Sequence, residues 1–375
     1  MKKALFLLLL AQVASILSAK SADEAIAALI AVGPKGQGNE AASQAWPKVA
    51  ALGAKELPAV LSAMDKANGL GQNWLRAAVD VIVERTLKNG DKLPVMELKN
   101  FLDDVSHQHV ARRLAFELIG KASPKSAAKL VPGFIDDPAP QLRRDAVAQV
   151  LEKAAAEKSA DLYDQALRAA RDVDQIEASA KALKEAGREV DLPEVMGFLM
   201  RWKVIGPFDN TDRKGFAVAY PPEKKIDFGA SYGGKEGKVK WSSFATSDSF
   251  GMVDVNLEYG ELKQVVAYAH TFYETPEARP VQFRLGCKNA WKVWLNGELL
   301  FARDEYHRGM RIDQYAIDAE LKKGKNVILV KLCQNEQKES WTKEWQFQLR
   351  VTDASGAAVL AANRLPTPKA PEKKR

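Results

Sequence analysis

The chain has 375 residues, of which 46% are hydrophobic and 27% are charged, so it is long enough to form two domains with separate cores. Its formal net charge of +7 arises mostly from Lys2, Lys3 and the basic residues at positions 364–375. The long segment between them is nearly neutral. This distribution argues against a phosphate-binding face and therefore against a nucleic-acid partner.

Residues 1–19 have the pattern of a secretory signal. Lys2 and Lys3 precede the apolar run LFLLLLAQVASIL, and small residues follow it as far as Ala19. The apolar run is short for a membrane span, although an uncleaved anchor is the alternative. We therefore expect export to the periplasm or the medium, with no membrane span after cleavage.

Residues 20–193 are predicted to form an α-helical repeat domain. Arg76, Arg113 and Arg144 occupy equivalent places in three helices whose apolar residues recur with helical spacing. Those residues are Leu75, Ala78, Val79, Ile82 and Val83; Val110, Leu114, Ala115 and Leu118; and Leu142, Ala146, Val147, Val150 and Leu151. Such helix pairs resemble degenerate HEAT repeats, which implies an α-solenoid.

The segment GREVDLP, from Gly187 to Pro193, is predicted to connect the helical domain to a second domain at residues 194–362. Glycine favours the end of a helix, and proline discourages its continuation. Residues 363–375 are rich in proline and basic residues, which predicts a disordered tail.

Several short alternating runs between Val281 and Glu336 predict antiparallel strands. Asn296-Gly297 predicts a tight hairpin turn, and Lys323-Gly324 predicts a second. If consecutive strands run antiparallel, the longer loops meet at one end of the sheet, which we call the rim. The two tight turns then lie at the opposite end.

The runs GCKNAWKVWLNG, LKKGKNVILVK and WQFQLRVTDASG, with the earlier WKVIGPF and YGGKEGKVKW, resemble the galactose-binding-like β-sandwich, a jelly roll similar to the sugar-binding domain of family 2 glycoside hydrolases. The resemblance covers residues 202–360. It implies an antiparallel β-sandwich as the second domain. Related modules often carry an Asp-Asp-Gly turn where this chain has Lys288-Asn289-Ala290, so a carboxylate-based calcium site is not expected at this turn.

Cys287 and Cys333 are both predicted to end strands at the rim, which makes them a candidate disulfide in an exported chain. Two separate buried thiols are the alternative, because cysteine packs well as a small hydrophobic residue.

The chain contains none of the common catalytic or nucleotide-binding motifs, so the sequence predicts a noncatalytic protein without a cofactor. His107 and His109 form an H-x-H pair, but no third ligand nearby completes a zinc site. We therefore expect no metal.

The candidate ligand-binding residues lie in the rim loops and combine aromatic faces with charged groups, the combination that a shallow sugar site requires. They are Tyr306, His307, Arg308, Arg311, Asp313 and Trp341. Trp341 is the best candidate for an exposed platform, because its neighbours in the sequence are polar. The alternative for Arg308 and Asp313 is a mutual ion pair that holds their own loop.

The favoured function is that of an exported binding or scaffold protein with carbohydrate as the ligand of the β-sandwich. A scaffold that binds only envelope proteins is the alternative. A third hypothesis is an accessory part of a polysaccharide-degrading system, or a hydrolase with an unrecognised site. The sequence does not predict an oligomeric state.

Overall fold

The computed structural model describes residues 20–369, so the predicted signal at residues 1–19 lies outside the described residues. The chain divides into two compact units between Gln175 and Ile176. This division falls earlier than the predicted connection at Gly187 to Pro193. The first unit is helical, and the second contains antiparallel sheets.

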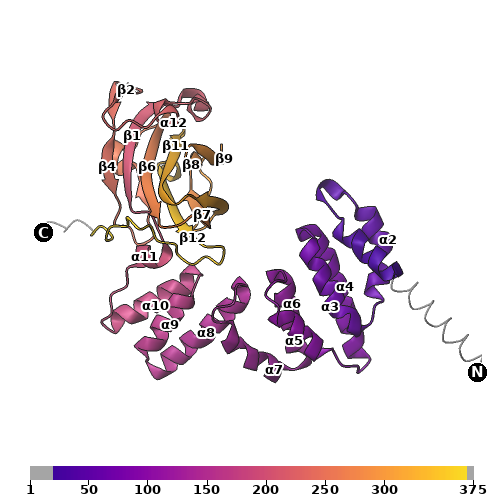
Figure 1. The fold of residues 1–375 in the computed structure, drawn as a ribbon. Coiled ribbons are helices and arrows are strands. Elements are labelled where there is room, and N and C mark those ends of the chain that lie inside the picture. Colours follow the sequence, from indigo (N-terminus) through magenta and orange to yellow (C-terminus); the bar gives the residue numbers. More distant parts are fainter. Residues whose placement is uncertain (1–19, 370–375) are drawn as a thin grey trace, which may run out of the picture. The chain divides into compact units, whose positions relative to one another are not determined.

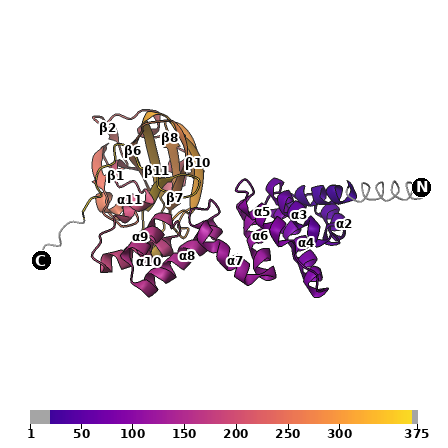
Figure 2. The same cartoon turned by 60° about the horizontal axis from the view of Figure 1, so that its bottom comes forward.

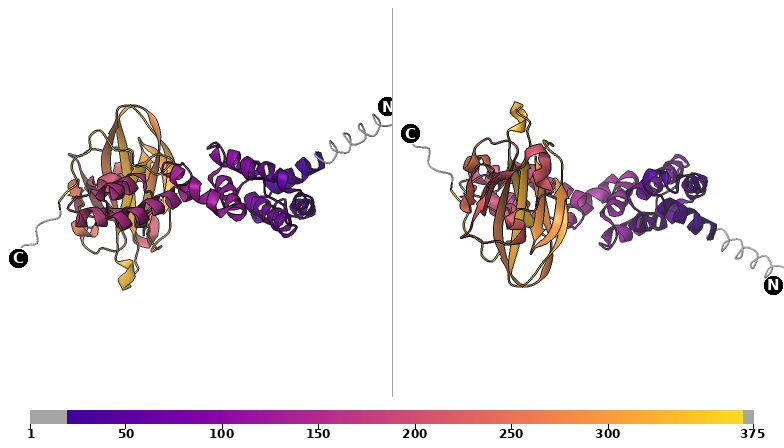
Figure 3. Two further views of the ribbon diagram at one scale, coloured as in Figure 1. Left: turned by 90° about the horizontal axis from the view of Figure 1, so that it is seen from below. Right: turned by 90° about the horizontal axis from the view of Figure 1, so that it is seen from above.

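The helical segments of the first unit follow one another in pairs along the chain (Figures 1 and 3). They are α2 (Asn39–Ala50), α3 (Leu57–Ala63), α4 (Gly69–Lys88), α5 (Val95–Asp103), α6 (His109–Ala122), α7 (Pro124–Leu130), α8 (Pro140–Glu157) and α9 (Ala160–Ala169), with 3-10 turns η1 (Pro34–Gly36), η2 (Ala54–Glu56), η3 (Met64–Lys66) and η4 (Val131–Phe134). Helix α10 (Val173–Glu185) begins in the first unit and continues into the second. Helix α4 begins at a side-chain cap, since Asn68 Oδ1 accepts hydrogen bonds from the amides of Leu70 and Gly71. The predicted apolar stripes of α4, α6 and α8 contribute to one buried core.

The three equivalent arginines each reach the next helix of the series. Arg76 pairs with Glu117 of α6 at 2.9 Å, Arg113 pairs with Asp145 of α8, and Arg144 pairs with Asp174 of α10. A further arginine of α6, Arg112, is buried and makes two hydrogen bonds of 2.7 Å to the carboxylate of Asp137. The repeat seen in the sequence is therefore also a repeat of contacts between successive helices.

The second unit contains the strands β1 (Arg201–Asp209), β2 (Ser231–Gly233), β3 (Lys238–Lys240), β4 (Ser242–Ala245), β5 (Val253–Asp254), β6 (Val265–Thr275), β7 (Arg279–Cys287), β8 (Ala290–Leu295), β9 (Glu298–Arg303), β10 (Tyr315–Leu321), β11 (Gly324–Gln334) and β12 (Gln346–Thr352). It also contains the short helices α11 (Leu192–Met196), α12 (Pro221–Lys224) and α13 (Asn256–Tyr259), and the 3-10 turns η5 (Thr211–Phe216) and η6 (Ser340–Thr342).

One sheet has six strands in the order β4-β1-β6-β11-β8-β9, and another has four in the order β10-β7-β12-β5 (Figures 1 and 2). A short two-stranded sheet pairs β2 with β3. All pairings are antiparallel. A single apolar core includes residues of both large sheets, among them Val204, Val330, Phe283 and Leu349. The antiparallel strands predicted for residues 281–332 are confirmed.

The turn at Asn296-Gly297 joins β8 to β9 as a hairpin, and both residues have the positive φ that this turn requires (54° and 86°). The turn at Gly324 differs from the prediction. It joins β10 of the four-stranded sheet to β11 of the six-stranded sheet, so it is not a hairpin between paired strands. The alternating pattern predicts strands, but it carries no information about which sheet each strand enters.

A second layer covers the outer face of the six-stranded sheet, the face turned away from the shared core. Ile205, Tyr268, Leu329 and Cys333 point outward from three consecutive strands, β1, β6 and β11, and are buried beneath segment 216–241. We call this segment, which includes α12, β2 and β3, the cover segment.

The tail predicted to be disordered begins with residues that form hydrogen bonds. Arg364 Nη1 donates to the carbonyl of Phe198 at 2.9 Å, and Thr367 Oγ1 donates to Asp191 Oδ1 at 2.8 Å. Polar contacts therefore hold this part of the tail against its own unit. No helix within residues 20–369 is both long and apolar enough to cross a membrane.

Candidate functional site

The rim brings three of the six predicted ligand-binding residues together. The ring centroid of His307 lies 5.6 Å from that of Trp341, with the two planes perpendicular, and 6.2 Å from that of Tyr306. Trp341, in η6, is 59% exposed. Trp341 therefore presents an exposed indole beside a histidine.

The other polar groups at the rim already bind one another. His307 Nε2 lies 2.6 Å from Asn335 Oδ1, and Asn210 Nδ2 donates to the hydroxyl of Tyr306 at 3.1 Å. The guanidinium of Arg213 lies 5.3 Å from the centroid of the Tyr306 ring. Burial lowers the pKa of His307 and raises that of Tyr306. These polar groups of the rim are thus hydrogen-bonded to one another, and the indole of Trp341 is the aromatic group that stays exposed.

The remaining three predicted residues do not join this cluster. Arg308 Nε pairs with Glu305 at 3.0 Å, and the side chain of Arg311 is exposed. Asp313 is partly buried and accepts hydrogen bonds from Arg284 Nη1 at 2.9 Å and from Arg350 Nε at 2.7 Å. The ion pair between Arg308 and Asp313, which was the alternative drawn from the sequence, is therefore not formed.

The ion pairs of Asp313 hold the four-stranded sheet. Arg284 belongs to β7 and Arg350 to β12, which are neighbouring strands, and the two arginines face each other in the register. Burial acts to raise the pKa of Asp313, but the hydrogen bonds from Arg350 and Arg284 outweigh this effect and lower it. The carboxylate of Asp313 thus forms ion pairs that stabilise the four-stranded sheet.

The predicted disulfide is not formed, because the two cysteines lie on different sides of the six-stranded sheet. Cys287 packs in the core between the large sheets, whereas Cys333 points outward from β11 beneath the cover segment. Both are free and buried. Burial raises the pKa of both thiols, that of Cys333 to about 12. The alternative of two separate buried thiols is the one that the structure supports.

The turn at Lys288-Asn289-Ala290 uses its side chains to hold a neighbouring segment. Lys288 forms an ion pair with Glu344, and Asn289 Nδ2 donates to the Glu344 carbonyl at 3.1 Å. Within residues 20–369, no group of three His, Cys, Asp or Glu side chains is placed to hold a metal ion.

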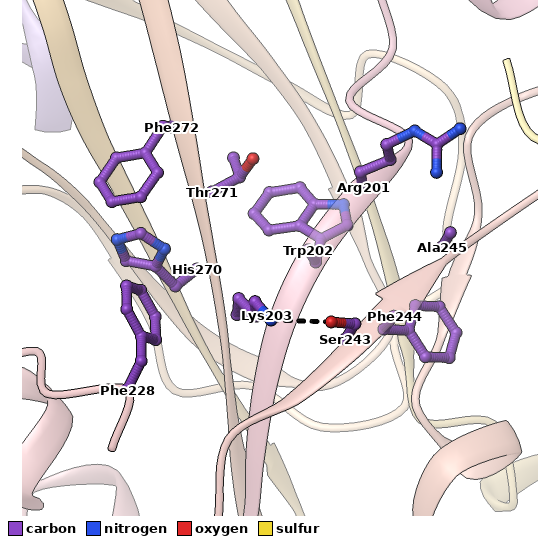
Figure 4. A pocket seen from close by; sticks show the side chains of 10 residues that line it. All are labelled: Arg201, Trp202, Lys203, Phe228, Ser243, Phe244, Ala245, His270, Thr271 and Phe272. Carbon is purple, nitrogen blue, oxygen red and sulfur yellow. Dashed lines mark hydrogen bonds between the residues drawn. The ribbon is translucent and has the colours of Figure 1, made fainter. Parts of the chain in front are cut away.

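A pocket that the sequence does not predict lies over β1, β4 and β6 on the outer face of the six-stranded sheet (Figure 4). Its volume is about 510 Å³. The side chains that line it are Arg201, Trp202, Lys203, Phe228, Ser243, Phe244, Ala245, His270, Thr271 and Phe272. We call it the outer pocket.

Strand pairing places the polar groups of the outer pocket. Lys203 of β1 lies opposite both Ser243 of β4 and His270 of β6, so the three side chains share one face. Lys203 Nζ donates to Ser243 Oγ at 2.7 Å, as Figure 4 shows. Phe228 comes from the cover segment and closes one side.

His270 is buried, with 1% of its surface exposed, and neither ring nitrogen has a hydrogen-bond partner. Its ring lies between those of Phe228 and Phe272, at centroid distances of 5.0 and 4.6 Å (Figure 4). Burial lowers its pKa to about 4, so the imidazole is neutral at pH 7. A neutral imidazole has one donor and one acceptor nitrogen, so it can pair with a hydroxyl group, which also both donates and accepts.

A buried ion pair fixes part of the cover segment above the sheet. Lys331 Nζ of β11 lies 2.8 Å from Glu223 Oε1 and donates to the carbonyl of Val218 at 2.7 Å. The hydroxyl of Tyr268 also donates to Glu223. In contrast, Phe228 lies beyond α12 in a segment without regular structure and is 40% exposed.

The sequence contains a weak signal for this site. His270 lies within the apolar run VVAYAHTFY, which is typical of a strand and which β6 contains, but neither ring nitrogen has a hydrogen-bond partner. The pocket needs β1, β4 and β6 to be neighbours, although long segments separate them in the chain. A histidine within an apolar strand is the one local sign of an unusual environment.

Comparisons with known proteins give little further information. No family model matches the chain, and no curated protein matches it. Among solved structures, a β-glucosidase from Kluyveromyces marxianus in complex with glucose is 17% identical over 24% of this chain and 11% of that chain, with a TM-score of 0.19. A selenomethionine-labelled structure of β-glucosidase from Kluyveromyces marxianus is 12% identical over 40% and 16%, with a TM-score of 0.24.

The GH31 α-xylosidase from Xanthomonas citri is 11% identical over 24% of this chain and 12% of that chain, with a TM-score of 0.17. This chain thus matches less than a fifth of each of these proteins, and scores of this size carry no argument about function. One prediction is nevertheless corrected. These matched structures are of glycoside hydrolases, so the prediction of a noncatalytic protein, which rests only on missing motifs, is not retained.

Proposed function

We propose that the chain is an exported protein that binds carbohydrate through its sheet-containing unit, at the outer pocket. In this proposal the two large sheets form a galactose-binding-like jelly roll, and the helical unit is a HEAT-like solenoid. The observation that carries the proposal is His270, a buried histidine without hydrogen-bond partners at the wall of an aromatic pocket.

A buried polar group without a partner is costly, by about 1–3 kcal/mol, and at a pocket wall it favours a ligand that supplies the missing bonds. A sugar hydroxyl both donates and accepts a hydrogen bond, as a neutral imidazole does. Sugar rings also have apolar faces that pack on aromatic side chains, and Phe228 and Phe272 provide such surfaces. Lys203 and Ser243 supply further polar contacts.

Phe228 controls access to His270 in this proposal. Its ring covers the imidazole, so a ligand reaches the ring nitrogens only when Phe228 turns aside. The segment around Phe228 has no regular secondary structure, and the residue is partly exposed, so this movement breaks no strand pairing. Binding therefore couples a local rearrangement of the cover segment to the formation of hydrogen bonds by His270.

A glycan array with residues 20–375 tests the proposal, followed by calorimetric titration of the best-bound oligosaccharide. We expect Phe228→Ala to weaken binding at least tenfold. Leu257→Ala is the matched control, because Leu257 is a strongly exposed apolar residue outside the pocket. Binding of no glycan, or equal effects of the two substitutions, would contradict the proposal.

The rim is a second candidate site for carbohydrate, favoured by the exposed indole of Trp341 beside His307. It lies at the loop-rich end of the strands, whereas the outer pocket lies toward the end that carries the two tight turns. An envelope protein remains the alternative partner, and a pull-down from envelope extract tests it.

A further inference from the structure

A second pocket adjoins the outer pocket on the same face of the six-stranded sheet. It has a volume of about 420 Å³ and lies over β8 and β11, between Trp294 and the Pro222–Ile226 part of the cover segment. Its floor residues Leu329 and Val327 are the cross-strand partners of His270 and Phe272 in the outer pocket. The two pockets therefore rest on adjacent, hydrogen-bonded strands.

Lys325 connects the two pockets physically. It lines the second pocket, and its Nζ lies 3.3 Å from the centroid of the Phe272 ring, which lines the outer pocket. The two neighbouring pockets lie over strands from β4 to β8 of the same sheet. We call the two together the cross-strand groove.

The groove is strongly positive. Six basic residues line it: Arg201, Lys203, Lys224, Lys225, Lys322 and Lys325. None of the six forms an ion pair with any residue of the described chain, 20–369. The one carboxylate among the lining residues, Glu223, is already engaged by Lys331 and Tyr268. Glu274, opposite Lys325 in the strand register, lies outside both pockets.

Unpaired lysines along a groove lower the free energy of a bound polyanion, because they concentrate positive potential in a concave surface. The aromatic rings of Phe228, which packs on β6, and of Trp294 in β8 add faces on which sugar rings stack. The chain between its basic ends is nearly neutral as a whole, so the excess of basic residues in this groove is balanced by acidic residues elsewhere in the chain.

We propose that the cross-strand groove binds an acidic polysaccharide, whose uronate carboxylates meet the lysines while its sugar faces pack on Phe228 and Trp294. This inference rests on the proposed carbohydrate-binding function and adds the class of ligand. It requires the ligand to span both pockets, so the lysines of the second pocket contribute to binding of a polymer and not to that of a short neutral sugar.

The test measures binding of residues 20–375 to polygalacturonate, to a neutral glucan and to single-stranded DNA of similar length, in low and high salt. We expect polygalacturonate to bind most tightly and its affinity to fall with salt. Lys225→Glu with Lys322→Glu should weaken polygalacturonate binding at least tenfold and leave the binding of short neutral sugars unchanged, because both residues line only the second pocket.

Lys125→Glu with Lys129→Glu is the matched control, because it makes the same change in net charge on exposed lysines of α7. Equal losses in the two double variants, or tighter binding of DNA than of polygalacturonate, would overturn the inference. If Phe228→Ala abolishes binding of neutral sugars but polygalacturonate shows no preference, only the acidic-ligand inference fails. If neither sugar binds, the proposed function fails with it.

Discussion

Lys331 of β11 places its ammonium 2.8 Å from the carboxylate of Glu223 in α12, and the side chain of Lys331 has no exposed surface. This contact joins the cover segment to the centre of the six-stranded sheet. The ammonium also donates to two backbone carbonyls of the cover segment, those of Phe216 and Val218. The pair therefore sets the position of one wall of the cross-strand groove.

We expect Glu223→Leu to lower the free energy of unfolding by about 3–5 kcal/mol, because it leaves the ammonium of Lys331 buried without a counter-charge. Urea unfolding followed by tryptophan fluorescence measures the change. Glu223→Leu combined with Lys331→Met removes both charges and should recover a large part of the loss. Equal stabilities of the single and double variants would show that the two charges are not coupled.

His270 should make the stability of the protein depend on pH. Its pKa is lowered from 6.5 to about 4 in the folded chain, so the unfolded chain takes up a proton first as the pH falls. The stabilisation is full above about pH 6.5 and is lost toward pH 4, by about 3 kcal/mol in total. His270→Leu has no imidazole to titrate. The difference in unfolding free energy between wild type and this variant should therefore change by about 3 kcal/mol between pH 7 and pH 4. A constant difference would contradict the burial of a neutral imidazole.

The same variant separates a binding role from a structural one. At pH 7, His270→Leu removes a buried polar group without a partner, so we expect stability to be unchanged or slightly raised. Carbohydrate affinity should fall, because the hydrogen bonds to the hydroxyl are lost. A stable variant with full carbohydrate affinity would show that His270 does not contact the ligand.

Trp341→Ala tests the rim. The indole is largely exposed, so we expect the free energy of unfolding to change by no more than about 0.5 kcal/mol. If sugar binds at the rim, its affinity should fall by about 1–3 kcal/mol, as for the loss of an aromatic contact at a binding hot spot. Phe228→Ala should leave the affinity of the rim unchanged, because the two residues lie toward opposite ends of the strands. A large loss of stability would place Trp341 in the core.

Thiol counting tests the state of Cys287 and Cys333. We expect two reactive thiols in denaturant without reductant, and almost none in the folded protein, because burial keeps both thiols protonated and inaccessible. Finding no thiol in denaturant would restore the disulfide that the sequence predicts.

The sequence predicts those features that depend on local patterns. Alternation identifies β7, β8 and β11, Asn296-Gly297 identifies the hairpin, and the spacing of Arg76, Arg113 and Arg144 identifies the helical repeat. Trp291 and Trp294 are three residues apart in one strand, and they occupy opposite faces as that spacing predicts.

The sequence does not predict features that depend on contacts between residues far apart in the chain. Asp313 pairs with Arg284 of β7 and Arg350 of β12, and the residues around Asp313 in the sequence do not indicate these partners. The outer pocket assembles Lys203, Ser243 and His270 from three strands that become neighbours only after folding. The cover segment has no periodicity, so its burial of Cys333 cannot be inferred from the residues around either cysteine.

The separation of the two thiols by a sheet has a practical consequence. Since the chain contains only these two cysteines and both are free, its fold contains no covalent cross-link. Its stability should therefore be the same in a reducing cytosol and in an oxidising compartment, and no disulfide isomerase is needed for folding. Recombinant chain made in a reducing bacterial cytoplasm should therefore have the same stability as chain made in an oxidising compartment.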